Sequence, residues 1–227
     1  MNFQGNFRKL GDLDPKLIKA FVDLMPQTDW TREVTRQKKF EVHKDTQTIG
    51  LVYDQDFRHM NGTRCPDFDL FKLALNPVFA NIAEYYETSP EMLITFNEPV
   101  QGYFIRVTLV KLLAGGEITE HRDMGFSLTH SHRVHVPIIT NDDVLFTIGS
   151  ETTNLKQGGI YEINNRRLHS VVNKSDSDRV HLILDWVFPW EPCCCSATVH
   201  PTEQCTPKTC LEIYTQVEQC DCFPEQG

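Results

Sequence analysis

The sequence predicts a mainly β fold with flanking helices, built on a double-stranded β-helix, the jelly roll of cupin-like proteins. Six short runs rich in β-branched and aromatic residues follow one another after residue 101, and turn-forming residues separate them. Helix-like segments come before these runs, and no internal repeat or low-complexity stretch interrupts them. Short strands at regular spacing indicate a sandwich or barrel, so we expect a jelly roll that helices buttress on one side.

The chain has 227 residues, enough for one domain with a substantial core and a small appendage. We expect the main domain over residues 1–190, with a helical and loop part over 1–100 and the jelly-roll core over 101–190. A cysteine-rich C-terminal tail follows over 191–227. The hydrophobic content of 40% and the charged content of 23% are ordinary for a soluble globular protein.

The formal net charge of −9 disfavours a general nucleic-acid-binding role, because such a role needs a basic face. The N-terminal residues contain no apolar core of signal-peptide length, and no stretch approaches the roughly 18 apolar residues of a membrane span. We therefore expect a soluble, cytoplasmic protein with neither nucleic acid nor membrane as a partner. The sequence does not indicate an oligomeric state.

Two helices are expected in the N-terminal part. The first covers residues 13–25, with Asp14 as its N-cap and Pro15 at the first helical position, where the missing N–H is harmless. The second covers residues 68–88, and Pro77 would kink or divide it.

The remaining N-terminal segments are expected to be extended or irregular. Residues 1–11 fit a short strand or arm, and 46–57 fit a strand because they are rich in residues that favour extended structure. The charged segment 30–42 fits a solvated loop or edge strand. The polar segment 54–67 fits a surface loop, or a lid if it lies near a pocket.

The jelly-roll core is predicted from the six β-rich runs. These runs cover residues 103–113, 132–140, 144–149, 158–164, 168–173 and 180–188.

Candidate metal ligands lie between the first two of these runs and within the fifth. His121 and Asp123 are one residue apart, so on a strand or strand end they point the same way and can reach one metal. His169 follows 48 residues later and can supply a third ligand from another strand of a closed sheet. Two histidines and one carboxylate, with three positions left open, suit non-haem Fe(II) that activates O2.

A candidate anion-binding residue follows ten residues after His169. Arg179 directly precedes the run 180–188 and would alternate inward among its apolar residues, and a buried arginine without a partner is costly. Its planar guanidinium can bind the carboxylate of a co-substrate through two hydrogen bonds. An internal Asp or Glu could serve as its partner instead.

The residues HRD, then RVHVPI, then GGIYEINNRRLHSVVNKSDSDRVHLILDW carry a family resemblance. In this pattern the chain resembles the aspartyl/asparaginyl β-hydroxylase family of Fe(II)/2-oxoglutarate oxygenases, which includes free-proline hydroxylases. The resemblance covers roughly residues 104–186, and more loosely the region from residue 30. An HxD motif alone is weak, but HxD with a distal His and an Arg ten residues later is a fairly specific combination.

The resemblance implies roles for the site residues. His121, Asp123 and His169 would hold the iron and form the catalytic centre; some members of the family have Gly at the position of Asp123 and use two histidines alone. Arg179 would form a salt bridge with the distal carboxylate of 2-oxoglutarate. Arg133 and His135 would contact the carboxylate of 2-oxoglutarate that lies nearer the metal.

The serine that many family members place near the distal carboxylate has no clear match, since Val110 stands at the aligned position. Thr108 and Tyr161 are the candidates for supplying a hydroxyl group in its place.

Other histidines and arginines lie outside the motif positions. We expect His130, His132 and His181 to be rim or surface residues. Three arginines are weaker candidates for contact with an acidic group of the substrate: Arg106, Arg122 and Arg166.

Together these features predict a dioxygenase with Fe(II), 2-oxoglutarate as co-substrate and O2. It would hydroxylate an amino acid or an aspartyl/asparaginyl-type peptidyl residue and release succinate and CO2. The alternative is a cupin-like module that binds or senses a metal without turnover. The three anion-binding side chains favour the enzyme, because a metal site alone does not need them.

The cysteines are concentrated in the tail. Seven of the eight lie in the last 35 residues, and only Cys65 stands apart. In a reducing compartment this density indicates metal binding or reactive thiols rather than permanent disulfides, but no CxxC pair supports a standard zinc site. The tail therefore fits an appendage of the jelly roll, either docked or loose, or a segment that binds a soft metal or a partner.

Overall fold

The structure is a computed structural model, and it describes residues 5–32, 34, 37–38, 40–54, 62–90, 101–123 and 126–188. Its strands form two sheets in which every pairing is antiparallel. The larger sheet has the order β1 (Phe7–Asp12), β9 (Gly159–Ile163), β6 (His132–Ile139), β11 (Arg179–Val187), β4 (Tyr103–Leu112), β2 (Thr46–Tyr53) and β3 (Thr63–Arg64). The smaller sheet has the order β5 (Glu117–His121), β10 (His169–Asn173), β7 (Val144–Ile148) and β8 (Glu151–Thr153). The predicted jelly-roll class is confirmed.

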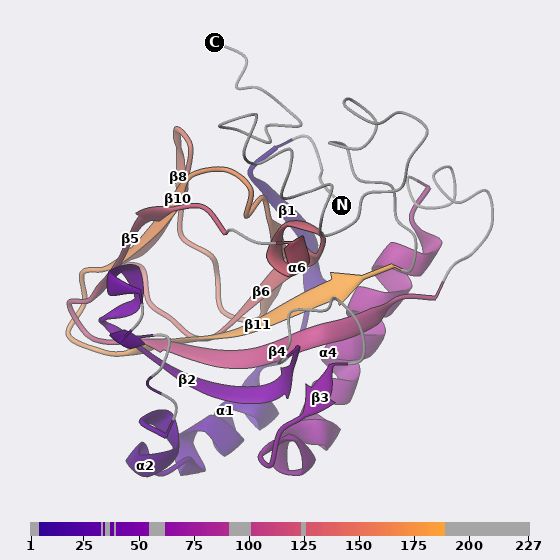
Figure 1. The fold of residues 1–227 in the computed structure, drawn as a ribbon, viewed down its shortest axis with the longest axis horizontal. Helices are drawn as coiled ribbons and strands as arrows, with labels where there is room; N and C mark the ends of the chain where they lie inside the picture. Colours follow the sequence, from indigo (N-terminus) through magenta and orange to yellow (C-terminus); the bar gives the residue numbers. More distant parts are fainter. Residues whose placement is uncertain are drawn as a thin grey trace.

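Two helices cover the outer face of the larger sheet. These are α1 (Lys16–Leu24) and α4 (Phe68–Thr88), which lie below β2, β4 and β11 in Figure 1, away from the smaller sheet. The shorter helical segments include α2 (Gln27–Trp30), η1 (Glu41–His43) and α6 (Phe126–Thr129). None of the described helices is long and apolar enough to cross a membrane.

The larger sheet separates two apolar cores, because successive side chains of a strand point to opposite faces. On β11, Val180, Leu182 and Leu184 belong to the core between the sheet and the helices. The other core lies between the two sheets, and Phe146, Ile163 and other apolar residues form it. The residues of β11 that alternate with the first set face the second sheet, and Arg179 is one of them.

The elements agree well with the sequence prediction. All six β-rich runs form strands, and the expected extended segments 1–11 and 46–57 correspond to β1 and β2. Three further strands of the described residues, β3, β5 and β8, extend the two sheets. Helix α4 is continuous across Pro77 rather than divided. Helix α1 begins at Lys16, one residue later than Pro15, and the Asp14 side chain accepts a hydrogen bond from the Lys16 N–H at 3.1 Å.

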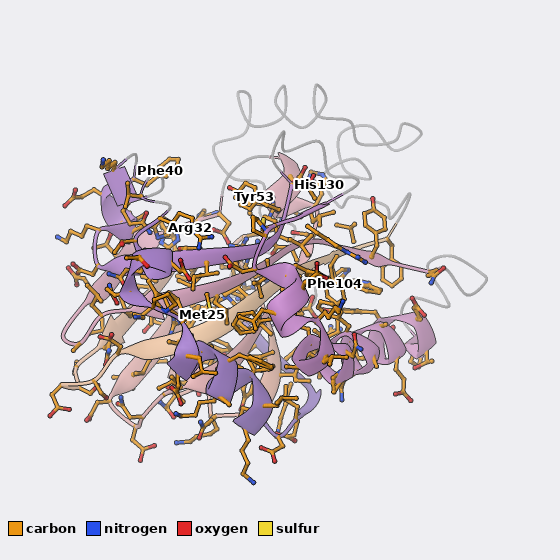
Figure 2. All side chains as sticks on the ribbon, turned by 90° about the horizontal axis from the view of Figure 1, so that it is seen from below. Met25, Arg32, Phe40, Tyr53, Phe104 and His130 are labelled. Atoms are coloured by element: carbon orange, nitrogen blue, oxygen red, sulfur yellow. The ribbon has the colours of Figure 1, made fainter. Side chains whose placement is uncertain are left out.

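The predicted loops are only partly covered. Within 54–67, residues 55–61 lie outside the described residues, and so does the whole predicted tail over 191–227. The boundary at residue 190 therefore stays a prediction. Figure 2 shows Phe40, Tyr53 and His130 toward one edge of the molecule, with Met25 nearer the helices.

Candidate active site

The two candidate histidine ligands lie opposite each other in the smaller sheet. His121 is the last residue of β5 and His169 is the first residue of β10. They are direct partners in the antiparallel pairing of these strands, and their ring centroids are 4.3 Å apart. The pairing thus brings together two residues that are distant in the sequence.

Asp123 completes this group from the segment just after β5. Its backbone N–H donates to the Asn165 carbonyl oxygen at 3.2 Å, and its Oδ1 lies 4.0 Å from His121 Nε2. One ligand atom from each of the three residues lies within 4.8 Å of the others. Within the described part of the chain, this is the only such cluster of three or more histidine, cysteine or carboxylate side chains.

Hydrogen bonds orient both imidazole rings toward the centre of this cluster. His121 Nδ1 is 2.7 Å from the Thr119 carbonyl oxygen, and His169 Nδ1 is 2.9 Å from the Arg167 carbonyl oxygen. A carbonyl only accepts, so Nδ1 carries the proton in both rings, and Nε2 keeps its lone pair for a metal.

Burial favours the neutral form of the second histidine. It lowers the pKa of His169 below the ordinary value, and this effect outweighs the opposing influence of Asp123. A neutral imidazole is the form that binds a metal. The donor set of two imidazoles and one carboxylate therefore fits an Fe(II) ion.

A pocket extends from this cluster between the two sheets. Its walls contain all six residues that the sequence singled out for metal and co-substrate: His121, Asp123, His169, Arg133, His135 and Arg179. The other lining residues are His43, Val110, Ile118, Phe146, Ile163, Val171 and Ile183. Neither Thr108 nor Tyr161, the candidate hydroxyl donors, is among them.

Arg179 is the most deeply buried charge of this pocket. Only 1% of the residue is exposed, and its Nε and Nη1 have no hydrogen-bond partner in the described structure. Burial lowers the pKa of Arg179 to about 9, and no carboxylate counteracts this effect. The described residues therefore provide no internal Asp or Glu partner, and the guanidinium has the environment of a binding site for an anion.

Arg133 and His135 lie on β6, on the face that lines the pocket. The Arg133 guanidinium donates to Asp123 Oδ2 through Nη1 at 2.5 Å, and to both oxygens of Asp185 through Nε and Nη2 at 2.8 and 2.9 Å. His135 Nδ1 lies 3.4 Å from His181 Nδ1. Burial, and then the charges of Arg179 and Arg133, hold the pKa of His135 well below its ordinary value, so its ring is neutral.

The three weaker arginine candidates do not line the pocket. Arg106 is buried and bonds internally, with Nε 2.5 Å from Asp185 Oδ2 and Nη1 3.1 Å from Ser127 Oγ. Arg166 is buried and Arg122 is half-buried.

The expectation that His130, His132 and His181 are rim or surface residues is wrong, because all three are buried. His132 and His181 lie on β6 and β11, which are inner strands of the larger sheet with a core on each face. In such strands, the side chains on both faces of the sheet point into a core and not toward solvent. His132 Nδ1 instead lies 2.7 Å from Glu162 Oε1, on the side of the helices.

Sequence reasoning missed Asp185 and His43. Asp185 is a charged residue within the apolar run LILDW, and its even spacing from Arg179 places both side chains on the same face of the strand. This pattern is visible in the sequence and could have pointed to Asp185. His43 lines the pocket from η1, with its ring centroid 5.5 Å from that of His121. The sequence around His43 carries no motif that singles it out.

The fold and the site define a class, a jelly-roll protein with a candidate His–Asp–His metal site beside a buried arginine. Residues 80–189 match the model of the family described as aspartyl/asparaginyl β-hydroxylase. This segment contains all six predicted site residues, and the match confirms the family resemblance that the sequence carries. None of the curated proteins matches the chain.

Solved structures with similar folds include three oxygenases. A 2OG-Fe(II) oxygenase family oxidoreductase from Burkholderia pseudomallei is 11% identical, with 63% of this chain and 66% of that chain covered and a TM-score of 0.46. A Pseudomonas putida prolyl-4-hydroxylase is 9% identical, with 80% and 92% covered and a TM-score of 0.46. A collagen prolyl hydroxylase from Paramecium Bursaria Chlorella virus-1 is 7% identical, with 80% and 96% covered and a TM-score of 0.45. The chain thus spans slightly less than two thirds of the Burkholderia protein.

Proposed function

We propose that this protein is a Fe(II)/2-oxoglutarate-dependent dioxygenase that hydroxylates an amino acid or an aspartyl- or asparaginyl-type peptidyl residue. The family match over residues 80–189 supports the hydroxylase class. The clustered His121, Asp123 and His169 support an iron site of two imidazoles and one carboxylate.

The observation that carries the proposal is the state of Arg179. A buried guanidinium without an internal partner costs folding free energy, unless a bound anion compensates it. Arg179 shares its pocket with the metal cluster, so one ligand with a carboxylate at each end can reach both. A dicarboxylate 2-oxo acid such as 2-oxoglutarate has this form, and a simple metal-binding module would not need this arginine.

Arg133 and His135 are proposed to contact the carboxylate nearer the metal. A guanidinium has five N–H groups, and the three bonds of Arg133 to Asp123 and Asp185 leave two for a ligand. Neutral His135 lies on the same strand and lines the same pocket. Both side chains can therefore donate to a carboxylate without breaking the bonds that hold Arg133.

When bound, Fe(II) would supply O2 chemistry in which oxidative decarboxylation of 2-oxoglutarate to succinate and CO2 is coupled to hydroxylation of a substrate C–H bond. The contribution of the chain is to bind and orient. Arg179 fixes the distal end of the co-substrate, and the triad fixes the metal. The apolar walls exclude water from the space between them; they are formed by Val110, Ile118, Phe146, Ile163, Val171 and Ile183.

The test is a turnover screen with the iron-loaded protein, 2-oxoglutarate and O2, over free amino acids and peptides that contain Asp or Asn. We expect one compound class to raise succinate formation above the background and to gain one oxygen atom, as mass spectrometry would show. The Arg179→Ala variant is the control, since it leaves the triad in place. Protein that binds iron but never forms succinate would instead favour the non-catalytic metal-binding module.

A further inference from the structure

We propose that Asp185 is a positioning residue of the metal centre. It holds Arg133 in place, and Arg133 in turn fixes the orientation of the ligand carboxylate of Asp123. The inference deepens the proposed function and rests on it, because it concerns the same metal site. It assigns a role to a buried carboxylate that is not among the proposed metal ligands and does not itself line the pocket.

The first step is the contact between Asp185 and Arg133. The two residues are direct cross-strand partners on β11 and β6, and both oxygens of Asp185 accept from the guanidinium at 2.8 and 2.9 Å. A two-bond contact of this kind fixes the plane of the guanidinium as well as its position. Asp185 is only 1% exposed, so water does not compete for these bonds.

The second step is the contact between Arg133 and Asp123. The Nη1 atom, which Asp185 does not use, donates to Asp123 Oδ2 at 2.5 Å. The other oxygen, Oδ1, is the one that lies 4.0 Å from His121 Nε2. Arg133 therefore occupies one oxygen and leaves the other directed at the metal position, which is the arrangement of a carboxylate that binds through a single oxygen.

The third step is the anchoring of Asp185 from its other side. Arg106, its cross-strand partner on β4, donates from Nε to Asp185 Oδ2 at 2.5 Å. Arg106 is itself held by Ser127, whose Oγ donates to Asp54 Oδ2 at 2.6 Å. Asp185 thus lies between two arginines on the strands that flank β11, and it is fixed before any metal binds.

The charge of Asp185 is maintained in this position. Burial alone would raise the pKa of the Asp185 carboxyl, but Arg133 and Arg106 hold it at about 2. Groups that orient a metal ligand through hydrogen bonds commonly change metal affinity by 10–100-fold when they are removed. Loss of the Asp185 carboxylate should therefore weaken metal binding, although Asp185 is not a ligand.

A purely structural role predicts a different result, and Glu162 provides the matched control. Glu162 is also a buried carboxylate of the larger sheet, at 2% exposure against 1% for Asp185. It contacts His132 on the helix side and does not line the pocket. Asp185→Asn and Glu162→Gln make the same chemical change at similar depth, but only the first affects Arg133.

The experiment titrates Co(II), without 2-oxoglutarate, into the full-length protein and follows the visible absorption of the bound ion. We expect Asp185→Asn to weaken Co(II) affinity by about tenfold or more and to change the shape of the spectrum. Glu162→Gln should keep the affinity and spectrum of the wild type, even if both variants lose thermal stability.

The decisive comparison uses the Asp123→Gly background, in which His121 and His169 remain as ligands. If Asp185 acts through Asp123, adding Asp185→Asn should not lower Co(II) affinity further. The proposal would be overturned if Asp185→Asn lowered Co(II) affinity by a similar factor in the Asp123→Gly background. It would also be overturned if the Asp185→Asn single variant bound Co(II) with wild-type affinity. Should Asp185→Asn fail to fold, Arg133→Lys makes the same test in the wild-type protein and in the Asp123→Gly background. Lysine keeps the positive charge of Arg133 and loses the two-bond geometry.

The outcome also separates this inference from the proposed function. Wild-type protein that binds no Co(II) would contradict the metal site itself. Wild-type protein that binds Co(II), with no difference between Asp185→Asn and Glu162→Gln, would contradict only the role of Asp185.

Discussion

His169 lies directly opposite His121 in the pairing of β10 with β5, and the two ring centroids are 4.3 Å apart. Each ring uses Nδ1 to donate to the carbonyl oxygen two residues earlier in its own chain segment. Two adjacent strands thus present two imidazole Nε2 atoms to one point, and Asp123 approaches the same point. The site is therefore organised by backbone pairing, before any metal binds.

This geometry predicts that His169 is indispensable for metal binding. We expect His169→Ala to abolish both iron retention and turnover, because the site would lose one of only two imidazole ligands. Iron content after desalting, measured by atomic absorption, checks the first effect. The control is Ser170→Ala. Ser170 is the next residue on β10, and its side chain points to the opposite face of the strand and does not line the pocket. Stoichiometric iron in the His169→Ala variant would show that the triad is assigned wrongly.

Arg179 is expected to set the affinity for the co-substrate. Arg179→Lys keeps a positive charge but loses the planar fork, so the binding free energy of 2-oxoglutarate should fall by about 1.5–3 kcal/mol, roughly tenfold to a hundredfold in affinity. Calorimetric titration of 2-oxoglutarate into Mn(II)-loaded protein measures this change without turnover. Arg32→Lys, at an exposed arginine that does not line the pocket, is the control. An unchanged affinity in both Arg179→Lys and Arg179→Ala would mean that another residue binds the distal carboxylate.

The sequence predicted the parts of this site that depend on local spacing. His121 and Asp123 share a strand parity, and Arg179 stands at an inward position of a β-rich run, so both features are visible in the order of the residues. The family resemblance added Arg133 and His135. The structure brings all of these residues to one pocket.

The features that the sequence did not reveal depend on which strands are neighbours. Asp185 meets Arg133 and Arg106 only because β11 lies between β6 and β4, and spacing along the chain does not contain this order. The burial of His132 and His181 has the same origin, since inner strands with a core on each face have no exposed side. Pro77 did not divide α4, because packing against the sheet stabilises that helix across its proline.

Gly158 is expected to be essential for the stability of the fold. Its φ of +77° is in the left-handed region, and a Cβ atom at this position would lie 2.5 Å from the Leu13 carbonyl oxygen. Gly115 has a similar φ of +67° but open space around a Cβ, so it separates backbone strain from the steric clash.

We expect Gly115→Ala to lower the free energy of unfolding by about 1 kcal/mol, from backbone strain alone. Gly158→Ala should lower it by about 2–4 kcal/mol, because the clash adds to the strain and the backbone atom it meets cannot turn away. Urea denaturation of both variants measures the two values. Equal losses at the two positions would contradict the predicted contact with Leu13.

The jelly roll is predicted to fold without the cysteine-rich tail. Strand β11 already closes the larger sheet between β6 and β4, and Phe188, just after it, is buried in the helix-side core. Truncation after Trp190 should therefore leave a protein that unfolds cooperatively in urea and still binds Fe(II) and 2-oxoglutarate. Turnover of the true substrate would fall only if the tail covers the pocket. Loss of the cooperative transition would show that the tail belongs to the core and that the boundary at 190 is misplaced.

The central claim is that one pocket holds iron at His121, Asp123 and His169 and a 2-oxo dicarboxylate at Arg179. The most direct measurement is the amount of succinate that the iron-loaded wild-type protein forms from 2-oxoglutarate under O2, compared with that of the Arg179→Ala and His169→Ala variants. We predict slow succinate formation by the wild type even without a substrate, a faster rate with the true substrate, and none above background in the His169→Ala variant. Arg179→Ala should need a far higher 2-oxoglutarate concentration for the same rate. Wild-type protein that carries stoichiometric iron and yet forms no succinate at saturating 2-oxoglutarate, with or without candidate substrates, would contradict the account.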